Sequence, residues 1–228
     1  MSEVPIEPKS AISFFHPSAS VSRARTQLDE TQETNSYDYS DASSINRFPN
    51  FHFNLHQLTP LSRLSAIVAA DRDQSRKVTL LVAVLEVDGP DAIRIKKGID
   101  AGKEVSLLKL IIGDEEGAVS KLTAWRDVAD AWGGNYPDPS APGVKRGDVI
   151  LLQNVLAGKE SMNSSTHSHR TLTASPHLRS TLEICYRTMP NSPEDAHFRP
   201  DLRLGFSDSA VRKVAAVVAW FEATAGLR

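Results

Sequence analysis

The sequence predicts a mainly β fold: a small five-stranded Greek-key barrel with one helix between its third and fourth strands. Three observations support this prediction. Runs rich in β-branched residues and leucine recur across residues 77–190, turn signals with glycine and proline separate them, and one short helical pattern interrupts the series. We expect residues 1–47 to be a disordered tail, 48–76 a lead-in that packs on the barrel, and 191–228 a linker with an amphipathic C-terminal helix.

Three strands are expected before the helix. The first, Lys77–Val87, ends at the turn signal Asp88-Gly89-Pro90, and the second is Val105–Ile112. Residues 113–117 carry a glycine at each end, and we expect both glycines in left-handed positions of a hairpin turn. This turn leads into the third strand, Ala118–Trp125.

A short helix, Arg126–Trp132, follows the third strand and precedes two more strands. The fourth strand is Asp148–Leu156, and the fifth consists of Thr171–Ser175 and Leu178–Arg187, broken by Pro176. Strand, strand, strand, helix, strand, strand is the order of the OB-fold. Other five-stranded barrels are alternatives, although a single helix after the third strand disfavours an SH3-like barrel.

Of the two segments before the barrel, the lead-in is expected to be ordered and the tail disordered. In the lead-in, Phe51, Phe53 and Leu55 alternate as in a short strand, and Thr59-Pro60 supplies an N-cap and a first-turn proline for a short helix near 60–69. The first 50 residues contain ten serines and few clustered apolar residues, which predicts disorder. Within this tail, the adjacent Phe14 and Phe15 are a candidate docking motif for a partner, with a chance cluster as the alternative.

The distribution of charge limits the kind of nucleic-acid binding that is expected. The chain has 26 Lys+Arg and 28 Asp+Glu, so its formal net charge is −2. Residues 1–50 hold 7 acids and 4 bases, hence −3, whereas residues 77–190 hold 14 of each. A neutral barrel argues against long, salt-sensitive coating of DNA. A short contact stacked on a few bases stays compatible with this charge.

Several function classes are not expected. No stretch approaches the roughly 18–20 apolar residues that span a bilayer, and the first ten residues lack the pattern of a signal peptide. The single Cys185 predicts a buried thiol in a reducing compartment. There is no phosphate-binding glycine loop, nucleophile elbow or metal-ligand set, and His167 and His169 have no evident third ligand. We therefore expect no enzyme activity, no cofactor and no membrane association.

Four segments carry a family resemblance. Lys121–Trp132 resembles a stretch of the large subunit of replication protein A, in which a strand ends in Thr-x-Trp and leads into an acidic, alanine-containing helix. Val144–Ile150 is similar to the start of that family's fourth strand, Arg170–Ser175 to its fifth strand, and 113–117 to its turn between strands two and three. The resemblance spans residues 77–190. The OB-folds of shieldin subunit 2, behind a disordered N-terminus, are a second group that the chain resembles.

The resemblance implies a non-enzymatic OB-fold that binds single-stranded DNA within a nuclear complex for repair, replication or telomeres. OB-folds grip single strands with strands two and three and the flanking loops, using aromatic rings for bases and cations for phosphates. Alternation places Lys121, Thr123 and Trp125 on one face of the third strand. By the resemblance, Trp125 occupies a base-stacking position; a tryptophan packed at the end of the barrel is the alternative.

The other candidate nucleic-acid residues are cations on the second strand and in the two loops that flank the binding face. They are Lys109, Arg94, Lys96, Lys97 and Arg170. The loop 157–170, after the fourth strand, departs from the family pattern because it contains no Phe, Tyr or Trp. An RNA-binding OB-fold is an alternative that the sequence does not separate from a DNA-binding one.

A protein–protein adaptor is the other alternative, in which the OB-fold and the C-terminal helix bind partner subunits. The helix is expected to begin at residues 207–209, with Ser207 as its cap. One face carries an apolar stripe, Trp220 lies on the opposite face, and a related helix in replication protein A subunits joins a bundle with partner subunits. The candidate partner-binding residues of the helix are Val211, Val214, Val218, Trp220 and Phe221. A helix packed on its own domain is the alternative.

Overall fold

A computed structural model describes residues 48–227, apart from 71–74, 99, 137–141 and 159–170. Every described residue lies within one compact unit, Asp38–Arg228. The predictions for the tail, including the Phe14-Phe15 motif, fall outside the described residues, as does Arg170. Among the helices of the described ranges, none combines the length and the apolar character needed to cross a membrane.

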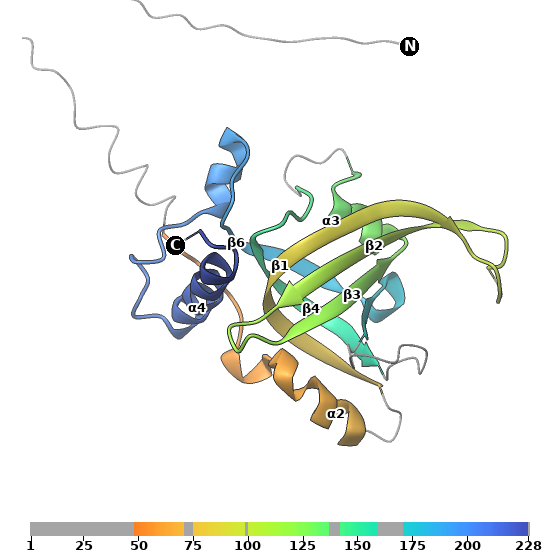
Figure 1. The fold of residues 1–228 in the computed structure, drawn as a ribbon, viewed down its shortest axis with the longest axis horizontal. Coiled ribbons are helices and arrows are strands. Elements are labelled where there is room, and N and C mark those ends of the chain that lie inside the picture. The colour runs from red at the N-terminus through yellow and green to blue at the C-terminus, as the bar shows by residue number, and fades with distance from the viewer. Residues whose placement is uncertain (1–47, 71–74, 99, 137–141, 159–170, 228) are drawn as a thin grey trace, which may run out of the picture. The chain divides into compact units, whose positions relative to one another are not determined.

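Five strands form a closed ring in the predicted order (Figure 1). Around the ring they are β1 (Ser75–Arg94), β2 (Glu104–Gly113), β3 (Val119–Trp125), β5 (Thr171–Ala174) and β4 (Asp148–Gly158), and β1 also pairs with β4. β3 and β5 pair in parallel, and the other neighbours pair antiparallel. Helix α3 (Asp127–Gly133) lies between β3 and β4 in sequence. This is the OB-fold topology, so the predicted fold class is confirmed.

The predicted fifth strand proves to be two strands. A 3-10 turn, Pro176–Leu178, separates β5 from β6 (Thr181–Arg187). Proline removes a ladder donor, and Arg179 adopts a left-handed φ of 57°, so the chain changes direction between the two strands. Among the described strands, β5 pairs with both β3 and β4, whereas β6 pairs with β4 only.

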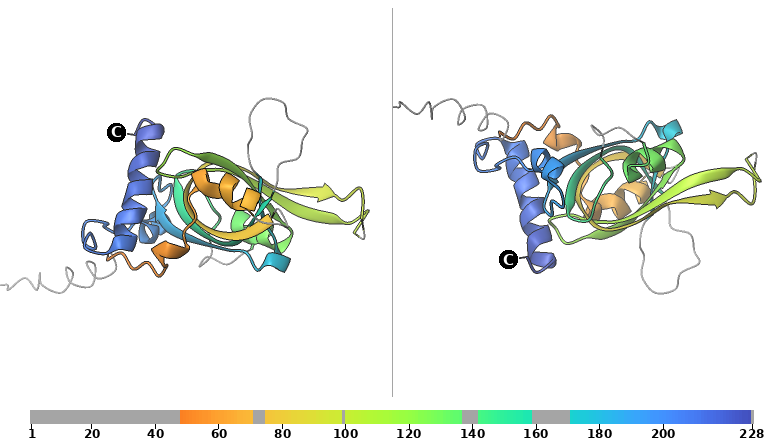
Figure 2. Two further views of the ribbon diagram at one scale, coloured as in Figure 1. Left: turned by 90° about the horizontal axis from the view of Figure 1, so that it is seen from below. Right: turned by 90° about the horizontal axis from the view of Figure 1, so that it is seen from above.

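The predicted end of the first strand at Asp88-Gly89-Pro90 is wrong. β1 continues to Arg94 because β2 is long enough to pair with it, and the register shift between Asp88 and Asp91 absorbs the turn signal as an irregularity within the ladder. Gly89 takes φ +100°, a conformation that favours glycine. The β1–β2 ribbon therefore projects beyond the rest of the barrel, as Figure 2 shows. Arg94, expected in a loop, lies at the end of a strand.

Strand alternation builds two apolar cores. One lies inside the ring, where buried residues of β2 and β3 meet those of β5; they include Leu108, Leu110, Ile112, Leu122, Ala124, Leu172 and Ala174. Along β1, Leu80 and Val82 face this core, while Leu81 and Ala83 belong to a second core on the outer side. Each fully buried Leu, Ile or Val contributes about 1.5–3 kcal/mol. β1 therefore has to be apolar on both faces, which explains its long apolar run.

The lead-in contributes to the outer core without forming the predicted strand. Phe51 and Phe53 have no strand pairing among the described residues, and their side chains pack against the outer core. The chain then makes a 3-10 turn, Leu55–Gln57, and one isolated bridge between Leu58 and Thr79. Burial of the aromatic rings outweighs their alternating pattern here, and the lead-in meets β1 after them, at Leu58.

The helix predicted near 60–69 is present, but its cap comes from the barrel. A 3-10 turn, Leu61–Arg63, leads into α2 (Leu64–Ala70). The Leu61 N–H donates to the Asp114 carboxylate (2.8 Å), and no side chain of the lead-in caps this end. Asp114 is 3% exposed and lies after β2, so this hydrogen bond ties the lead-in to the hairpin. The expected capping role of Thr59 is therefore wrong.

The C-terminal helix α4 (Ser209–Thr224) packs on the outer face of the barrel (Figures 1 and 2). Its cap is Asp208, whose side chain accepts from the Ala210 N–H (2.8 Å), rather than the predicted Ser207. The apolar stripe is buried within this chain, with exposures of 1%, 0%, 5% and 1% for Val211, Val214, Val218 and Phe221. The helix therefore packs on its own domain, which was the alternative prediction. Its apolar stripe faces the barrel, whereas a partner was expected there.

Trp220 also differs from its predicted outward position. Its ring lies directly over Gly113, where an added Cβ would overlap the ring. Gly113 has no left-handed φ, so its requirement for glycine comes from this close approach, whereas Gly117 takes the predicted left-handed φ of +80°. The Lys213 ammonium group also pairs with Glu115 in the same hairpin. The α4 helix is thus held to the β2–β3 turn on the side that was expected to meet a partner.

A buried ion-pair network connects the barrel to the segment before α4. Arg187 is 0% exposed and donates to both carboxylate oxygens of Asp148 (2.8 Å each), to the Gly143 carbonyl (3.0 Å) and to Asp195. Burial opposes ionisation of Asp195, but the Asn191 N–H and the Lys145 and Arg187 side chains hold its pKa below the ordinary value. This network fixes residues 193–198 against β6.

Candidate nucleic-acid interface

The outer face of β3 presents the residues that alternation predicted. Lys121 is exposed, and Thr123 and Trp125 are half-buried, whereas Ser120, Leu122 and Ala124 between them are buried. Side chains that alternate in this way leave the first three in reach of a ligand that lies across the sheet.

Register places β2 side chains beside them. Lys109 lies opposite Thr123, and Leu107 lies opposite Trp125. The Lys109 ammonium group also contacts the Asp88 carboxylate (2.8 Å), and this hydrogen bond raises the pKa of Lys109. Both groups are about half exposed, so the ion pair is weak and a phosphate group can compete for the lysine.

A groove of about 640 Å³ joins two of the predicted sets of residues. Trp125 from the end of β3 lies in the same lining as three cations from the end of β1 and the loop that follows. The described residues that line the groove are Ile93, Arg94, Ile95, Lys96, Lys97, Trp125, Arg126 and Ser175. The described part of the groove therefore contains four cations, one indole ring and no acid. Lys109, Lys121 and Thr123 are not in its lining and lie on the adjoining sheet face.

The four cations are not equally available. The Arg94 guanidinium group donates to the Gly102 carbonyl (3.1 Å), and Arg126 pairs with Asp100. Hydrogen bonds from Lys103 and Arg126 lower the pKa of Asp100 to about 2, so its carboxylate is ionised at neutral pH. Within the described part of the chain, Lys96 and Lys97 form no ion pair, and both are exposed.

Sequence reasoning missed four lining residues: Ile93, Ile95, Arg126 and Ser175. The two isoleucines alternate with basic residues in the segment 93–97, so the sequence already placed them next to the predicted cations. Arg126 adopts a left-handed φ of 59°, which is uncommon outside glycine and turns the chain sharply from β3 into α3. Ser175 follows a strand that pairs in parallel with β3, and this pairing brings it beside Trp125.

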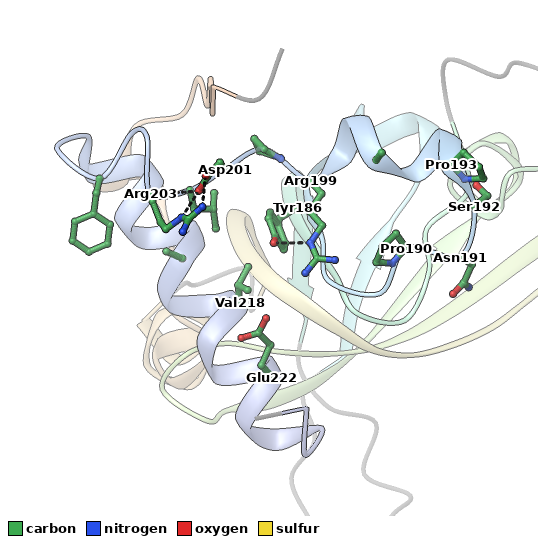
Figure 3. A pocket seen from close by; sticks show the side chains of 15 residues that line it. Tyr186, Pro190, Asn191, Ser192, Pro193, Arg199, Asp201, Arg203, Val218 and Glu222 are labelled. Carbon is green, nitrogen blue, oxygen red and sulfur yellow. Dashed lines mark hydrogen bonds and ion pairs between the residues drawn. The ribbon is translucent and has the colours of Figure 1, made fainter. Parts of the chain in front are cut away.

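A larger cavity lies elsewhere, between β6, the segment 190–206 and α4 (Figure 3). It measures about 900 Å³, and Tyr186 and Val218 contribute to its walls. The Arg199 guanidinium group donates to the Tyr186 hydroxyl (3.0 Å) and lies near its ring. None of the predicted nucleic-acid residues with described positions lines it. In the residues with described positions, no cluster of three or more His, Cys, Asp or Glu side chains is placed to hold a metal ion.

The closed ring, the helix between β3 and β4 and the cationic groove define an OB-fold domain, a class of small barrels that bind ligands across strands two and three. Within this class, the sequence model of the first OB-fold domain of shieldin complex subunit 2 matches residues 59–184, more than half of the chain. The chain therefore belongs to that family. A search of curated proteins finds no match.

Solved structures of replication protein A are also similar to this chain. One is a replication protein A heterotrimer bound to single-stranded DNA, with 15% identity, a TM-score of 0.39, and coverage of 66% of this chain and 28% of that chain. Another is a domain of replication protein A from Methanococcus maripaludis, with 14% identity, a TM-score of 0.29, and coverage of 59% and 94%. This chain thus spans less than a third of the first structure's chain. At such low TM-scores, neither structure identifies a ligand for this chain.

Proposed function

We propose that this chain binds single-stranded DNA through the groove at Trp125, as a subunit of a nuclear complex that serves DNA repair, replication or telomeres. The observation that carries the proposal is the joint lining of one groove by an indole ring and by Lys96 and Lys97, which form no ion pair with a described residue, with no acid among the described lining residues. Membership of a shieldin subunit family supports the assignment to a complex. We further propose that residues 77–190 are the binding barrel and that 48–76 and 191–228 support it.

The proposed roles follow from the chemistry of the groove. Trp125 stacks on one base, and Lys96 and Lys97 contact the phosphates on either side of it. The strand then continues over the outer face of β3, where Thr123, Lys121 and Lys109 are in reach. A site of this size holds only a few nucleotides. Its affinity therefore depends on stacking more than on total charge, in keeping with a neutral barrel.

The test is the salt dependence of oligonucleotide binding by the full chain. The probes are labelled ten-nucleotide oligomers of deoxythymidine and of uridine, and a DNA duplex of ten base pairs. The double variant Lys96→Gln, Lys97→Gln should bind the DNA single strand more weakly. Its plot of log affinity against log salt concentration should be less steep by about 1.4, since each lost phosphate contact removes about 0.7.

The matched control is Arg63→Gln, Arg146→Gln, which removes two exposed cations away from the groove and should leave the slope unchanged. Equal slopes for the wild type and the groove variant would contradict the proposed roles of the two lysines. Stronger binding of the uridine oligomer would make RNA the ligand, and stronger binding of the duplex would contradict a single-strand site.

A protein-binding function is the second candidate, and exposed apolar side chains favour it. Phe48, Leu204 and Phe206 are 57%, 49% and 59% exposed, and Phe206 lines the cavity beside α4. Exposed large apolar groups near a cavity are typical of interaction surfaces. A partner at this surface would contact the exterior around Phe206, since the apolar stripe of α4 is covered by the barrel.

A further inference from the structure

Strand β6 has an open edge. It pairs with β4 on one side, and no described strand pairs with its other side. In an antiparallel ladder, every second residue directs its N–H and C=O groups away from the partner strand. Between Thr181 and Ile184, these outward groups are therefore available to an additional strand.

A groove of about 560 Å³ runs beside this edge. The strand side of its lining is Ser180, Thr181, Leu182, Glu183 and Ile184, and the opposite side is Ala131, Trp132, Pro142 and Phe198. Leu182 and Ile184 are half-buried toward the barrel core, and Trp132 is almost fully buried. The groove thus combines backbone hydrogen-bonding groups with apolar walls, which is the chemistry that an extended peptide requires.

The charge of the groove distinguishes between occupants. Among the described lining residues, Glu183 is the one with a charged side chain, and it is exposed. If a second copy of this chain paired antiparallel in the register centred on Glu183, the two Glu183 carboxylates would lie directly opposite each other, which is unfavourable. A lysine or arginine at that position of another chain would be favourable. This charge argues for a heterologous, basic partner.

We propose that β6 binds an extended segment of a partner protein as an added strand. In this arrangement, apolar side chains at alternate positions lie with Leu182 and Ile184, and a basic side chain lies beside Glu183. The site shares no lining residue with the Trp125 groove, so it does not depend on the proposed nucleic-acid binding. One face of the barrel would then hold a partner while another holds a single strand.

The test uses two synthetic eight-residue peptides with the full chain. One alternates isoleucine with lysine, and the other alternates isoleucine with glutamate. The wild type should bind the lysine peptide about two- to five-fold more tightly, the range expected for one cross-strand charge pair, and Glu183→Lys should invert this preference. Glu104→Lys, a matched change at an exposed acid on a strand that is paired with β1, should leave the preference unchanged.

Two further measurements fix the place and mode of binding. The lysine peptide should slow amide hydrogen exchange within residues 180–184, and a version with two central prolines, which lack the N–H donors, should not bind. The proposal is overturned by absence of saturable binding up to about 1 mM, by protection confined to another region, or by competition from a deoxythymidine oligomer. Concentration-dependent dimerisation of the free chain through 180–184 would make a second copy the occupant and also overturn it.

Discussion

Asp100 limits the positive charge beside the Trp125 groove. It accepts a hydrogen bond from the Lys103 ammonium group (2.8 Å) and pairs with Arg126, which is in the groove lining. The pKa of Asp100 is lowered to about 2, so both cations face an ionised carboxylate at neutral pH. Asp100→Asn keeps the size of the side chain and removes its charge. We expect this variant to bind single-stranded DNA more tightly than the wild type.

The expected size of the effect follows from the exposure of the two released cations. The Lys103 and Arg126 side chains are 69% and 37% exposed, so each has access to a phosphate on a strand in the groove. Each new phosphate contact on a single strand steepens the log–log salt slope by about 0.7. One or two contacts therefore steepen it by about 0.7–1.4. Over a fourfold rise in salt, one contact adds a loss of affinity of about 2.6-fold.

Fluorescence anisotropy of a labelled deoxythymidine oligomer, titrated at four salt concentrations, measures this slope. Glu183→Gln is the control, because it removes one exposed acid outside the groove and should change neither affinity nor slope. A folded Asp100→Asn protein with the wild-type slope, or with weaker binding at low salt, would show that Asp100 does not hold Lys103 and Arg126 back from the DNA. Because the folded pKa of Asp100 is lowered from 3.8, its contribution to stability should be complete above about pH 4 and be lost as the pH falls toward 2.

Two stability predictions follow from the packing. Asp148→Ala leaves the buried Arg187 guanidinium group with an incomplete set of acceptors, and should lower the free energy of unfolding by about 3–5 kcal/mol in urea titrations; a loss below about 1 kcal/mol would contradict a buried pair. Gly113→Ala places a methyl group against the Trp220 ring and should cost about 1–3 kcal/mol. Gly158→Ala, whose added Cβ would lie 4.0 Å from the Thr171 carbonyl oxygen, should change stability by less than about 0.5 kcal/mol. Equal melting temperatures for the two alanine variants would show that α4 is not held at Gly113.

The barrel was predictable because strand alternation and turn residues are local signals. Leu122 and Ala124 face inward and Lys121 and Trp125 face outward, as the period of two requires. The end of β1 was not predictable from local signals. Asp88-Gly89-Pro90 has turn chemistry, and only the length of the partner strand β2 carries the ladder past it. Tertiary pairing outweighs turn propensity at this point.

Long-range contacts account for the other differences. The cap on Leu61 comes from Asp114, 53 residues away. The sequence favoured Thr59 because it is the neighbouring residue with a capping side chain. The exposure of Trp220 could not be inferred from a helical wheel, because the small Gly113 that receives its ring lies on another element. For the site, the sequence identified Trp125 and the basic segment separately. The structure adds that they line one groove, and that Ser175 reaches it through the parallel pairing of β5 with β3.

The most direct test of the nucleic-acid groove is the affinity of Trp125→Ala for a short deoxythymidine oligomer at moderate salt. Removing one stacked base should cost about 1–3 kcal/mol and raise the Kd by about 5- to 150-fold. Tyr136→Ala, which removes a 49% exposed aromatic ring outside the groove, should bind like the wild type. A folded Trp125→Ala protein with a Kd within about twofold of the wild type would contradict the account.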